Sequence, residues 1–407
     1  MTTLSKQFFE SAFCNYECRE LLHPWEKSCT KAQAQFVKSC FAGAVKYYGL
    51  FYLVSALLKY KEWDEKYLIN HLICYSKSLT AGTLIGSTFL TAACILRSIL
   101  GRFYYNTGTF LPGTIGGLFV FIASPSKRDM ISQVFLQLIM ESFVNKLEIS
   151  GTVRLRHVGI GTLLFMITNA YLLYLLRLET NKDGKKKRLP IWIFRPPRPS
   201  SKNTTNGNPC NHCDTEFCYD YILEGVKTYF KYGCIVELCK IIIKNFSTIK
   251  SSPLAIPSLL LKLNIKTGLF AAGYVGIYRA ITCYLCQKHG KDDPRYAIVG
   301  GFASGVVYPF FPLFNLLLTA ISSCIFIHLW KVEDKYRVPI GNLLFAICLG
   351  YSFNVRIFTP NACPSSLARI ISSITNGRAD DIVNHIQRET TMKVAENISN
   401  QLLSQKL

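Results

Sequence analysis

The sequence has few charged residues, and acidic ones are especially scarce. Only 17% of its 407 residues are charged, and 25 Asp and Glu stand against 46 Lys and Arg. Half of the residues are hydrophobic, and the mean hydropathy of +0.22 is high for a soluble enzyme of this length. This shortage of charge argues against a soluble globular protein and favours a membrane protein.

Two kinds of signal are missing. The first 20 residues lack the apolar core of a secretory signal and contain charged residues such as Lys6, Glu10 and Arg19, so we expect an internal segment to direct insertion. There is also no GxSxG, Walker loop, HExxH or Rossmann fingerprint in a suitable context. We therefore expect a protein that is not an enzyme and that needs no cofactor.

What the sequence does contain is a series of apolar stretches near the length of a membrane span, which needs about 20 residues. Six are clear, at 40–58, 79–100, 158–176, 269–286, 313–330 and 338–355. Four weaker ones are shortened or interrupted by polar groups, at 110–123, 130–144, 226–243 and 296–311. The expected fold class is an all-α polytopic membrane helix bundle.

Landmarks of the first half of the chain recur in the second half. Cys29 and Cys213, Gly49 and Gly233, the Gly116-Gly117 and Gly300-Gly301 pairs, and Pro125 and Pro309 are each 184 positions apart. A later block, 158–165, recurs at an offset of 180 as 338–345. We predict two tandem repeat halves, which are inverted if each has five spans and parallel if each has four.

The repeat and the composition divide the chain into four regions. We expect a first repeat half at 1–178, a basic Pro- and Ser-rich linker at 179–209, a second repeat half at 210–364 and a polar helical tail at 365–407. The linker carries the run Lys185, Lys186, Lys187 and Arg188 directly after a span. This run is either an orientation signal or a lipid-contacting or targeting cluster. Because the basic residues lie between apolar spans, we expect membrane lipids and not nucleic acid as partners.

Fourteen of the 16 cysteines fall into two groups. Those in or beside apolar stretches are expected to act as small packing residues; they are Cys74, Cys94, Cys234, Cys239, Cys283, Cys286, Cys324 and Cys348. The others cluster at Cys14, Cys18 and Cys29, near His23, and at Cys210, Cys213 and Cys218, near His212. Zinc binding, disulfides and free cysteines at the first helix of each half all fit these spacings, and free cysteines are favoured.

Glycines and two acidic residues indicate how the spans pack. Pairs spaced by four put small residues on one helix face, where two backbones approach closely; they are Gly82 and Gly86, Gly113 and Gly117, and Gly301 and Gly305. Glu141 and Glu237 lie in weakly apolar stretches. They either line a polar path or turn to neighbouring helices, and the second interpretation is favoured.

Several segments together resemble the transmembrane protein 135 family over nearly the whole chain. They are His23-Pro24-Trp25 with Cys29, Cys94-Ile95-Leu96-Arg97, Gly101-Arg102-Phe103-Tyr104, the second Cys-rich stretch before Tyr219, and Asp292-Asp293 leading to 297–305. The segment 297–305 is also similar to the glycine-rich helices of the Tim17, Tim22 and Tim23 translocase superfamily, so a Tim17-like part is expected. The resemblance implies no catalytic residues.

The family resemblance implies a multi-pass protein of mitochondrial and peroxisomal membranes. It implies roles in the balance of mitochondrial fission and fusion, in peroxisome organisation and in lipid homeostasis, with the dynamin-related fission machinery as a partner. A transporter or a lipid or sterol conduit is the alternative, because the chain combines duplication, small-residue helices and polar groups in its spans.

Overall fold

The computed structural model describes residues 5–58, 63–152, 154, 156–180, 218–244, 264–311 and 313–404. Throughout these residues the regular structure is helical, which confirms the all-helical part of the predicted fold class. The basic run from Lys185 to Arg188 lies outside the described residues.

Five helices of the described chain are long and apolar enough to cross a membrane. They are α4 (Glu65–Leu100), α7 (Val158–Thr180), α11 (Lys266–His289), α13 (Phe314–Tyr336) and α14 (Ile340–Phe358). Each carries one of the six clear apolar stretches predicted from the sequence. The remaining stretch, 40–58, is the C-terminal part of α3 (Cys29–Leu58), whose side chains are described as far as Ala56 and which is not among the five.

The ends of α4 are set by local chemistry. The Asp64 side chain caps its N-terminus by accepting a hydrogen bond of 2.5 Å from the Tyr67 backbone N–H. At the other end Gly101 has a φ of 72°, a left-handed conformation that glycine adopts without the steric penalty of a side chain. The helix between these signals has 36 residues. Its length is therefore about 54 Å, well beyond a hydrocarbon core of about 30 Å.

The chain divides into two compact units. Unit 1 contains Met1–Val153 and Leu329–Leu407, and unit 2 contains Arg154–His328. These boundaries differ from those of the predicted repeat halves, because α7 packs within unit 2 and α14 within unit 1. Repeat halves concern sequence similarity, whereas the units reflect packing, and the duplication itself stays a prediction.

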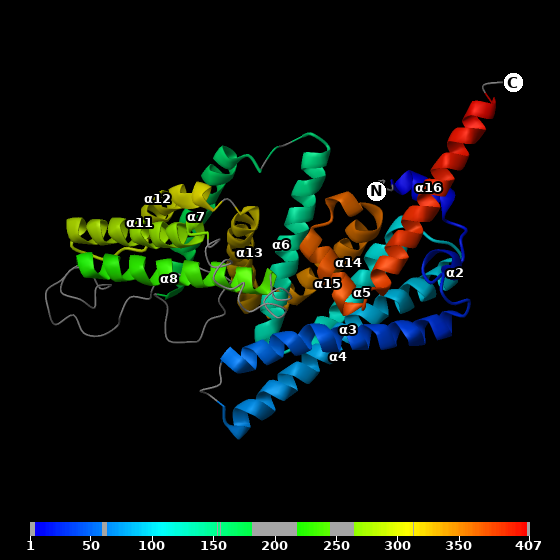
Figure 1. Ribbon diagram of the computed structural model, residues 1–407, viewed down its shortest axis with the longest axis horizontal. Coiled ribbons are helices and arrows are strands. Elements are labelled where there is room, and N and C mark those ends of the chain that lie inside the picture. Colours follow the sequence, from blue (N-terminus) through cyan, green and yellow to red (C-terminus); the bar gives the residue numbers. More distant parts are fainter. Residues whose placement is uncertain are drawn as a thin grey trace, which may run out of the picture. The chain divides into compact units, whose positions relative to one another are not determined.

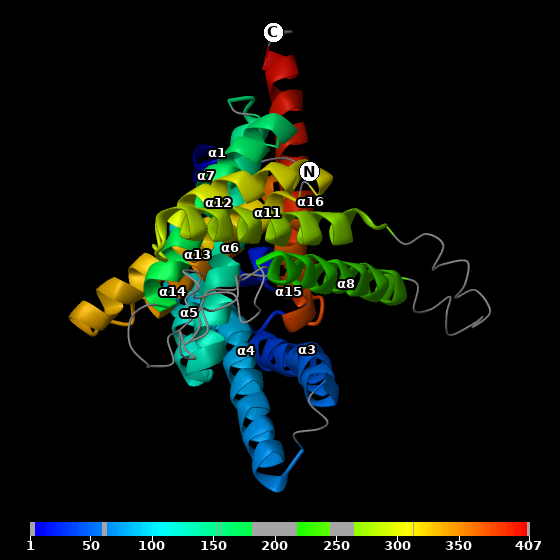
Figure 2. The ribbon, with the colours of Figure 1, turned by 90° about the vertical axis from the view of Figure 1, so that its left-hand side faces the viewer.

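Unit 1 is built on a hairpin of α3 and α4, which lie side by side in both views (Figures 1 and 2). α14 packs against the short helix α5 (Leu111–Gly117) and against α6 (Pro125–Ile149). α5 follows a π-helical turn, η2 (Asn106–Phe110), and continues into a 3₁₀ turn, η3 (Leu118–Ile122). The expected weak stretch at 110–123 is therefore a short broken helix.

The tail of the chain completes unit 1 with two helices, α15 (Ser365–Ile374) and α16 (Arg378–Ser404). Their apolar face, formed by Ile371, Ile382, Val383 and Ile386, is buried. Three short helices also belong to this unit: α1 (Lys6–Ala12), α2 (Cys18–Leu21) and η6 (Pro360–Ala362).

Unit 2 pairs α11 with α8 (Cys218–Lys244), and the two helices run alongside each other in Figures 1 and 2. α11 also packs against α12 (Tyr296–Ser304), which continues into the 3₁₀ turn η5 (Gly305–Phe310). α12 in turn packs against α7. A short glycine-rich helix thus lies at the centre of this unit, as α5 does in unit 1.

Candidate metal centre

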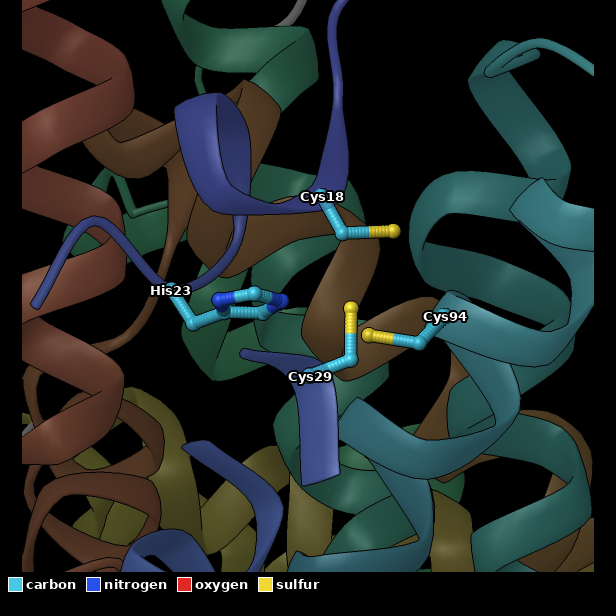
Figure 3. A group of neighbouring side chains, drawn as sticks. All are labelled: Cys18, His23, Cys29 and Cys94. Carbon is cyan, nitrogen blue, oxygen red and sulfur yellow. The ribbon is translucent and has the colours of Figure 1, made fainter. Parts of the chain in front are cut away.

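Three thiols and one imidazole gather where the N-terminal segment meets the α3–α4 hairpin (Figure 3). Cys18 is the first residue of α2, and Cys29 is the first residue of α3. Cys94 lies in α4, six residues before its end, and His23 follows α2. The three Sγ atoms and one ring nitrogen of His23 all lie within 4.8 Å of one another. Three separate elements therefore supply one compact group of metal-binding atoms.

Arg97 holds the N-terminal segment against α4. Its Nε donates a hydrogen bond of 3.0 Å to the carbonyl of Tyr16, two residues before Cys18. Arg97 lies three residues after Cys94, and residues three apart share one helix face. The face of α4 that presents the Cys94 thiol therefore also anchors the backbone that leads into Cys18.

The His23 ring is oriented by the turn after α2. Its Nδ1 lies 2.8 Å from the carbonyl oxygen of Glu26. A carbonyl only accepts, so Nδ1 carries a proton, and Nε2 is the ring nitrogen that remains for a metal, which would take the place of any proton there. The residue is fully buried, and Nε2 has no hydrogen-bond partner among the described residues. A buried acceptor is costly to leave unsatisfied, and a metal ion is a partner that would accept its lone pair.

Electrostatics favours the thiolate form of Cys18. Hydrogen bonding with the Cys94 thiol is the main cause that lowers the pKa of Cys18 to about 5; burial opposes it and His23 adds to it. Burial acts to lower the pKa of His23, but the interactions with Cys18 and with the Glu26 carbonyl outweigh it and raise that pKa. Because metals bind thiolates, the lowered pKa of Cys18 favours its metal-binding form.

Three cysteines and one histidine form a donor set that suits Zn²⁺, which binds thiolate sulfur at about 2.3 Å and imidazole nitrogen at about 2.0 Å. In a tetrahedral site these lengths place two sulfurs about 3.8 Å apart. The atoms here lie within 4.8 Å, so a small inward shift of side chains would close the site. Soft sulfur ligands disfavour Mg²⁺ and Ca²⁺, which prefer oxygen.

The N-terminal cysteine cluster predicted from the sequence is only partly brought together. Cys18 and Cys29 meet His23, whereas Cys14 is not part of the group. Cys94, which the sequence assigned to packing, is the fourth member, so that assignment was incomplete. No local signal identifies Cys94, because it approaches the others only through the α3–α4 hairpin, 65 residues beyond Cys29 along the chain.

The second predicted cluster lies mostly outside the described residues, which exclude Cys210, His212 and Cys213. Cys218 is described at the start of α8, where its sulfur accepts a hydrogen bond of 3.1 Å from Gln287 Nε2. It also packs against the buried pair Cys283 and Cys286 of α11.

The glycine pairs lie at helix contacts in each unit. Gly82 and Gly86 of α4 face α3, where a Cβ on Gly86 would lie 2.9 Å from the Cys40 sulfur. The other two pairs behave similarly: Gly113 and Gly117 approach α14, and Gly301 and Gly305 approach α7.

The two glutamates lie on helices that are not among the five candidate spans. Glu237 of α8 accepts a hydrogen bond from Thr267 of α11, so it turns toward a neighbouring helix. Glu141 lies half-buried in α6.

The five apolar helices define a multi-pass membrane protein. Its residues 15–146 match the family model of the N-terminal cysteine-rich region of Transmembrane protein 135, and this part of the expected resemblance is confirmed. All four residues of the candidate metal centre lie inside the matched region. No solved structure matches the chain. The Tim17-like character of 297–305 stays a prediction.

Proposed function

We propose that the protein is a non-enzymatic scaffold of mitochondrial and peroxisomal membranes that regulates the balance of mitochondrial fission and fusion. Peroxisome organisation and lipid homeostasis are part of the same proposal. The match of residues 15–146 to the Transmembrane protein 135 region supports it, because these roles are the ones that the resemblance implies. Membrane lipids and the dynamin-related fission machinery are the proposed partners.

The observation that best supports the scaffold proposal is the close backbone contact at the centre of each unit. In unit 1 a Cβ on Gly113 would lie 2.8 Å from the Gly350 Cα, and in unit 2 a Cβ on Gly301 would lie 2.9 Å from the Ala170 Cα. Both distances are too short for a side chain, so dispersion between backbones holds these helices together. Helices in such contact leave little room for a permeating molecule.

The same contacts support the tandem duplication. α7 ends the predicted first half and packs on α12 in unit 2, whereas α14 ends the predicted second half and packs on α5 in unit 1. In the predicted alignment α7 corresponds to α14, and α5 to α12. We therefore include in the proposal that the two halves have exchanged their last helices, so that each glycine-rich helix packs against the last helix of the other half.

Rescue of mitochondrial shape tests the scaffold. Cells that lose the protein are expected to have elongated mitochondria, and wild-type protein is expected to restore their length. The decisive variant is Ala123→Leu, which fills the apolar cavity described below. Ala34→Leu, at an exposed position of α3, is its matched control. If Ala123→Leu is expressed normally but fails to restore length while the control succeeds, the scaffold proposal is wrong.

A lipid conduit is the second candidate, and one observation favours it. An apolar cavity of about 50 Å³ lies within unit 1, bounded by α3, α4, η3, α6, α14 and α15. Its lining includes Tyr48, Ala81, Val120, Ala123 and Phe345. Saturable lipid transfer by the protein reconstituted in liposomes, abolished by Ala123→Leu and retained by Ala34→Leu, would support this candidate.

A further inference from the structure

We propose that Cys18, His23, Cys29 and Cys94 form a structural zinc site that fastens the N-terminal segment to the α3–α4 hairpin. The proposal goes beyond the scaffold function, which makes no use of a metal. It rests on the identity of the four ligands, on the hydrogen bond that orients the His23 ring and on the elements that the site connects.

The first argument is the chemistry of the ligand set. Four protein ligands saturate a tetrahedral Zn²⁺ and leave no position for water or substrate, which is the arrangement of structural sites. Three of the ligands are sulfur, and the fourth is an imidazole nitrogen. Such a set selects zinc over the oxygen-preferring cations.

The second argument is the second shell around His23. A histidine that binds a metal through one ring nitrogen usually donates the other N–H to a carbonyl or carboxylate. Here Nδ1–H donates to the Glu26 carbonyl at 2.8 Å, and the buried Nε2 has no hydrogen-bond partner in the described chain. The donation to Glu26 therefore uses Nδ1 and leaves Nε2 as the ring nitrogen that a metal would bind.

The third argument is that hydrogen bonds hold the N-terminal segment against α4 even without a metal. Arg97 joins α4 to the Tyr16 carbonyl, and the Phe103 backbone N–H donates a hydrogen bond of 2.8 Å to the Cys14 carbonyl just after α4. Both bonds lie on the C-terminal side of Cys94 and hold the N-terminal segment against the end of α4. A metal here would bind a preformed pocket, which lowers the ordering cost of coordination.

Cys94 lies near the polar C-terminal end of α4. The apolar stretch 79–100 reaches this end, so the length by which α4 exceeds a span of about 20 residues lies at its N-terminal end. Cys94 lies six residues from the C-terminal end of α4. The adjacent Arg97, Gly101 and Arg102 form a polar end that suits the membrane surface. Zinc would therefore reach the site from water.

Metal content of the purified full-length protein tests the site. The chain is prepared in detergent with an affinity tag that contains no histidine, and zinc, iron and copper are measured together by mass spectrometry. We expect about one Zn²⁺ per chain. Cys18→Ser and Cys94→Ser are expected to reduce bound zinc at least about tenfold, and Cys14→Ser, in the same segment but outside the group, is expected to keep it.

If a serine variant fails to fold, two measurements on the wild-type protein still test the site: cobalt binding and labelling of its thiols. Wild-type protein stripped of metal and given Co²⁺ alone is expected to show the visible absorption of tetrahedral thiolate-bound cobalt. Adding a chelator is expected to make Cys18, Cys29 and Cys94 react faster with maleimide, with no change at Cys14. Wild-type protein without zinc, bound iron or copper in its place, or a disulfide among these cysteines would overturn the proposal.

Discussion

The two units bring helices together in the same way but differ in the side chains that surround the close contact. In unit 1 the contact between α5 and α14 is flanked by stacked aromatic rings: Phe89 lies 4.2 Å from Phe353, and Tyr105 lies 4.3 Å from Phe358, measured between ring centroids. The small residues allow close approach, and the aromatic rings then bury a large apolar area beside it.

Unit 2 uses buried polar groups at the corresponding place. Asn169 of α7 is fully buried and donates hydrogen bonds to the Gly301 carbonyl at 2.7 Å and to Ser304 Oγ at 3.2 Å. The Tyr274 hydroxyl donates to the Asn169 side-chain oxygen at 2.6 Å. One amide thus joins α7, α12 and α11. The comparison indicates that glycine sets the distance between helices, whereas the surrounding side chains decide how specifically they are held.

The largest expected difference between the units concerns their ion pairs. Arg177 and Asp292 form a salt bridge in unit 2 with side chains only 6% and 13% exposed, whereas the Arg356–Asp380 pair of unit 1 is 16% and 34% exposed. Removing one partner of a buried pair leaves an uncompensated charge. We expect Arg177→Met to destabilise unit 2 by about 3 kcal/mol and Arg356→Met to destabilise unit 1 by about 1 kcal/mol.

Hydrogen exchange with mass spectrometry would measure both changes, because peptides report on each unit separately. Asp292→Asn serves as the reciprocal variant for the buried pair. Equal effects of the two arginine variants would contradict the idea that unit 2 depends more on buried polar contacts.

The next effect concerns glycine at the close backbone contact. A Cβ on Gly117 would lie 2.5 Å from the Ala346 Cα, whereas a Cβ on Gly49 would meet only the Tyr75 hydroxyl at 3.8 Å. We expect Gly117→Ala to destabilise unit 1 by about 2 kcal/mol because the helices must separate. Gly49→Ala is the matched control, and we expect it to be neutral or stabilising by up to about 1 kcal/mol. Unfolding in mixed detergent and SDS, followed by circular dichroism, measures both. A neutral Gly117→Ala would mean that the helices do not approach this closely.

A smaller effect is expected at the buried asparagines. Asn169 makes three hydrogen bonds in unit 2, whereas Asn354 in unit 1 donates one, of 3.2 Å, to Thr109 and interacts with the Tyr105 hydroxyl. We expect Asn169→Ala to cost about 1.5 kcal/mol and Asn354→Ala about 0.6 kcal/mol, since hydrogen bonds between membrane helices are modest. The same unfolding assay measures this order, and the reverse order would remove the proposed contrast between the units.

The smallest effect is expected at the surface of unit 1. Lys46 Nζ of α3 donates a hydrogen bond of 3.0 Å to the Asn376 side chain in the turn between α15 and α16. Both residues are exposed, so water replaces the bond readily. We expect Lys46→Met to change the stability of unit 1 by less than about 0.5 kcal/mol in a thermal scan. A larger loss would show that the tail is fastened by polar contacts and not by its buried isoleucines.

Long apolar stretches predicted the spans well because membrane insertion depends on local hydropathy. The stretches at 158–176 and 338–355 coincide closely with α7 and α14. The assignment of these helices to units could not be predicted in this way. α7 and α14 have similar composition. Only the close contacts of α7 with Gly301 and of α14 with Gly117 decide which helix joins which unit.

The candidate metal centre, too, could be predicted only in part from the sequence. The spacing of Cys18, His23 and Cys29 was compatible with a partial ligand set, because all three lie within one short segment, although free cysteines were the favoured interpretation. Cys94 resembled a packing residue, since its neighbours in sequence are apolar and a buried cysteine usually is one. Its role depends on the register of α4 against α3, which the tertiary structure sets.

Unit 1 is assembled from both ends of the chain, and this affects the order in which the two units can fold during synthesis. Gly117 leaves the ribosome long before Ala346, its contact on α14, and synthesis runs at about 5 to 20 residues per second. The glycine face of α5 therefore lacks its partner helix α14 for roughly 10 to 50 seconds after it is synthesised. During that interval all of unit 2 is synthesised and can fold first. The N-terminal part of unit 1 is thus synthesised before unit 2 and completed after it.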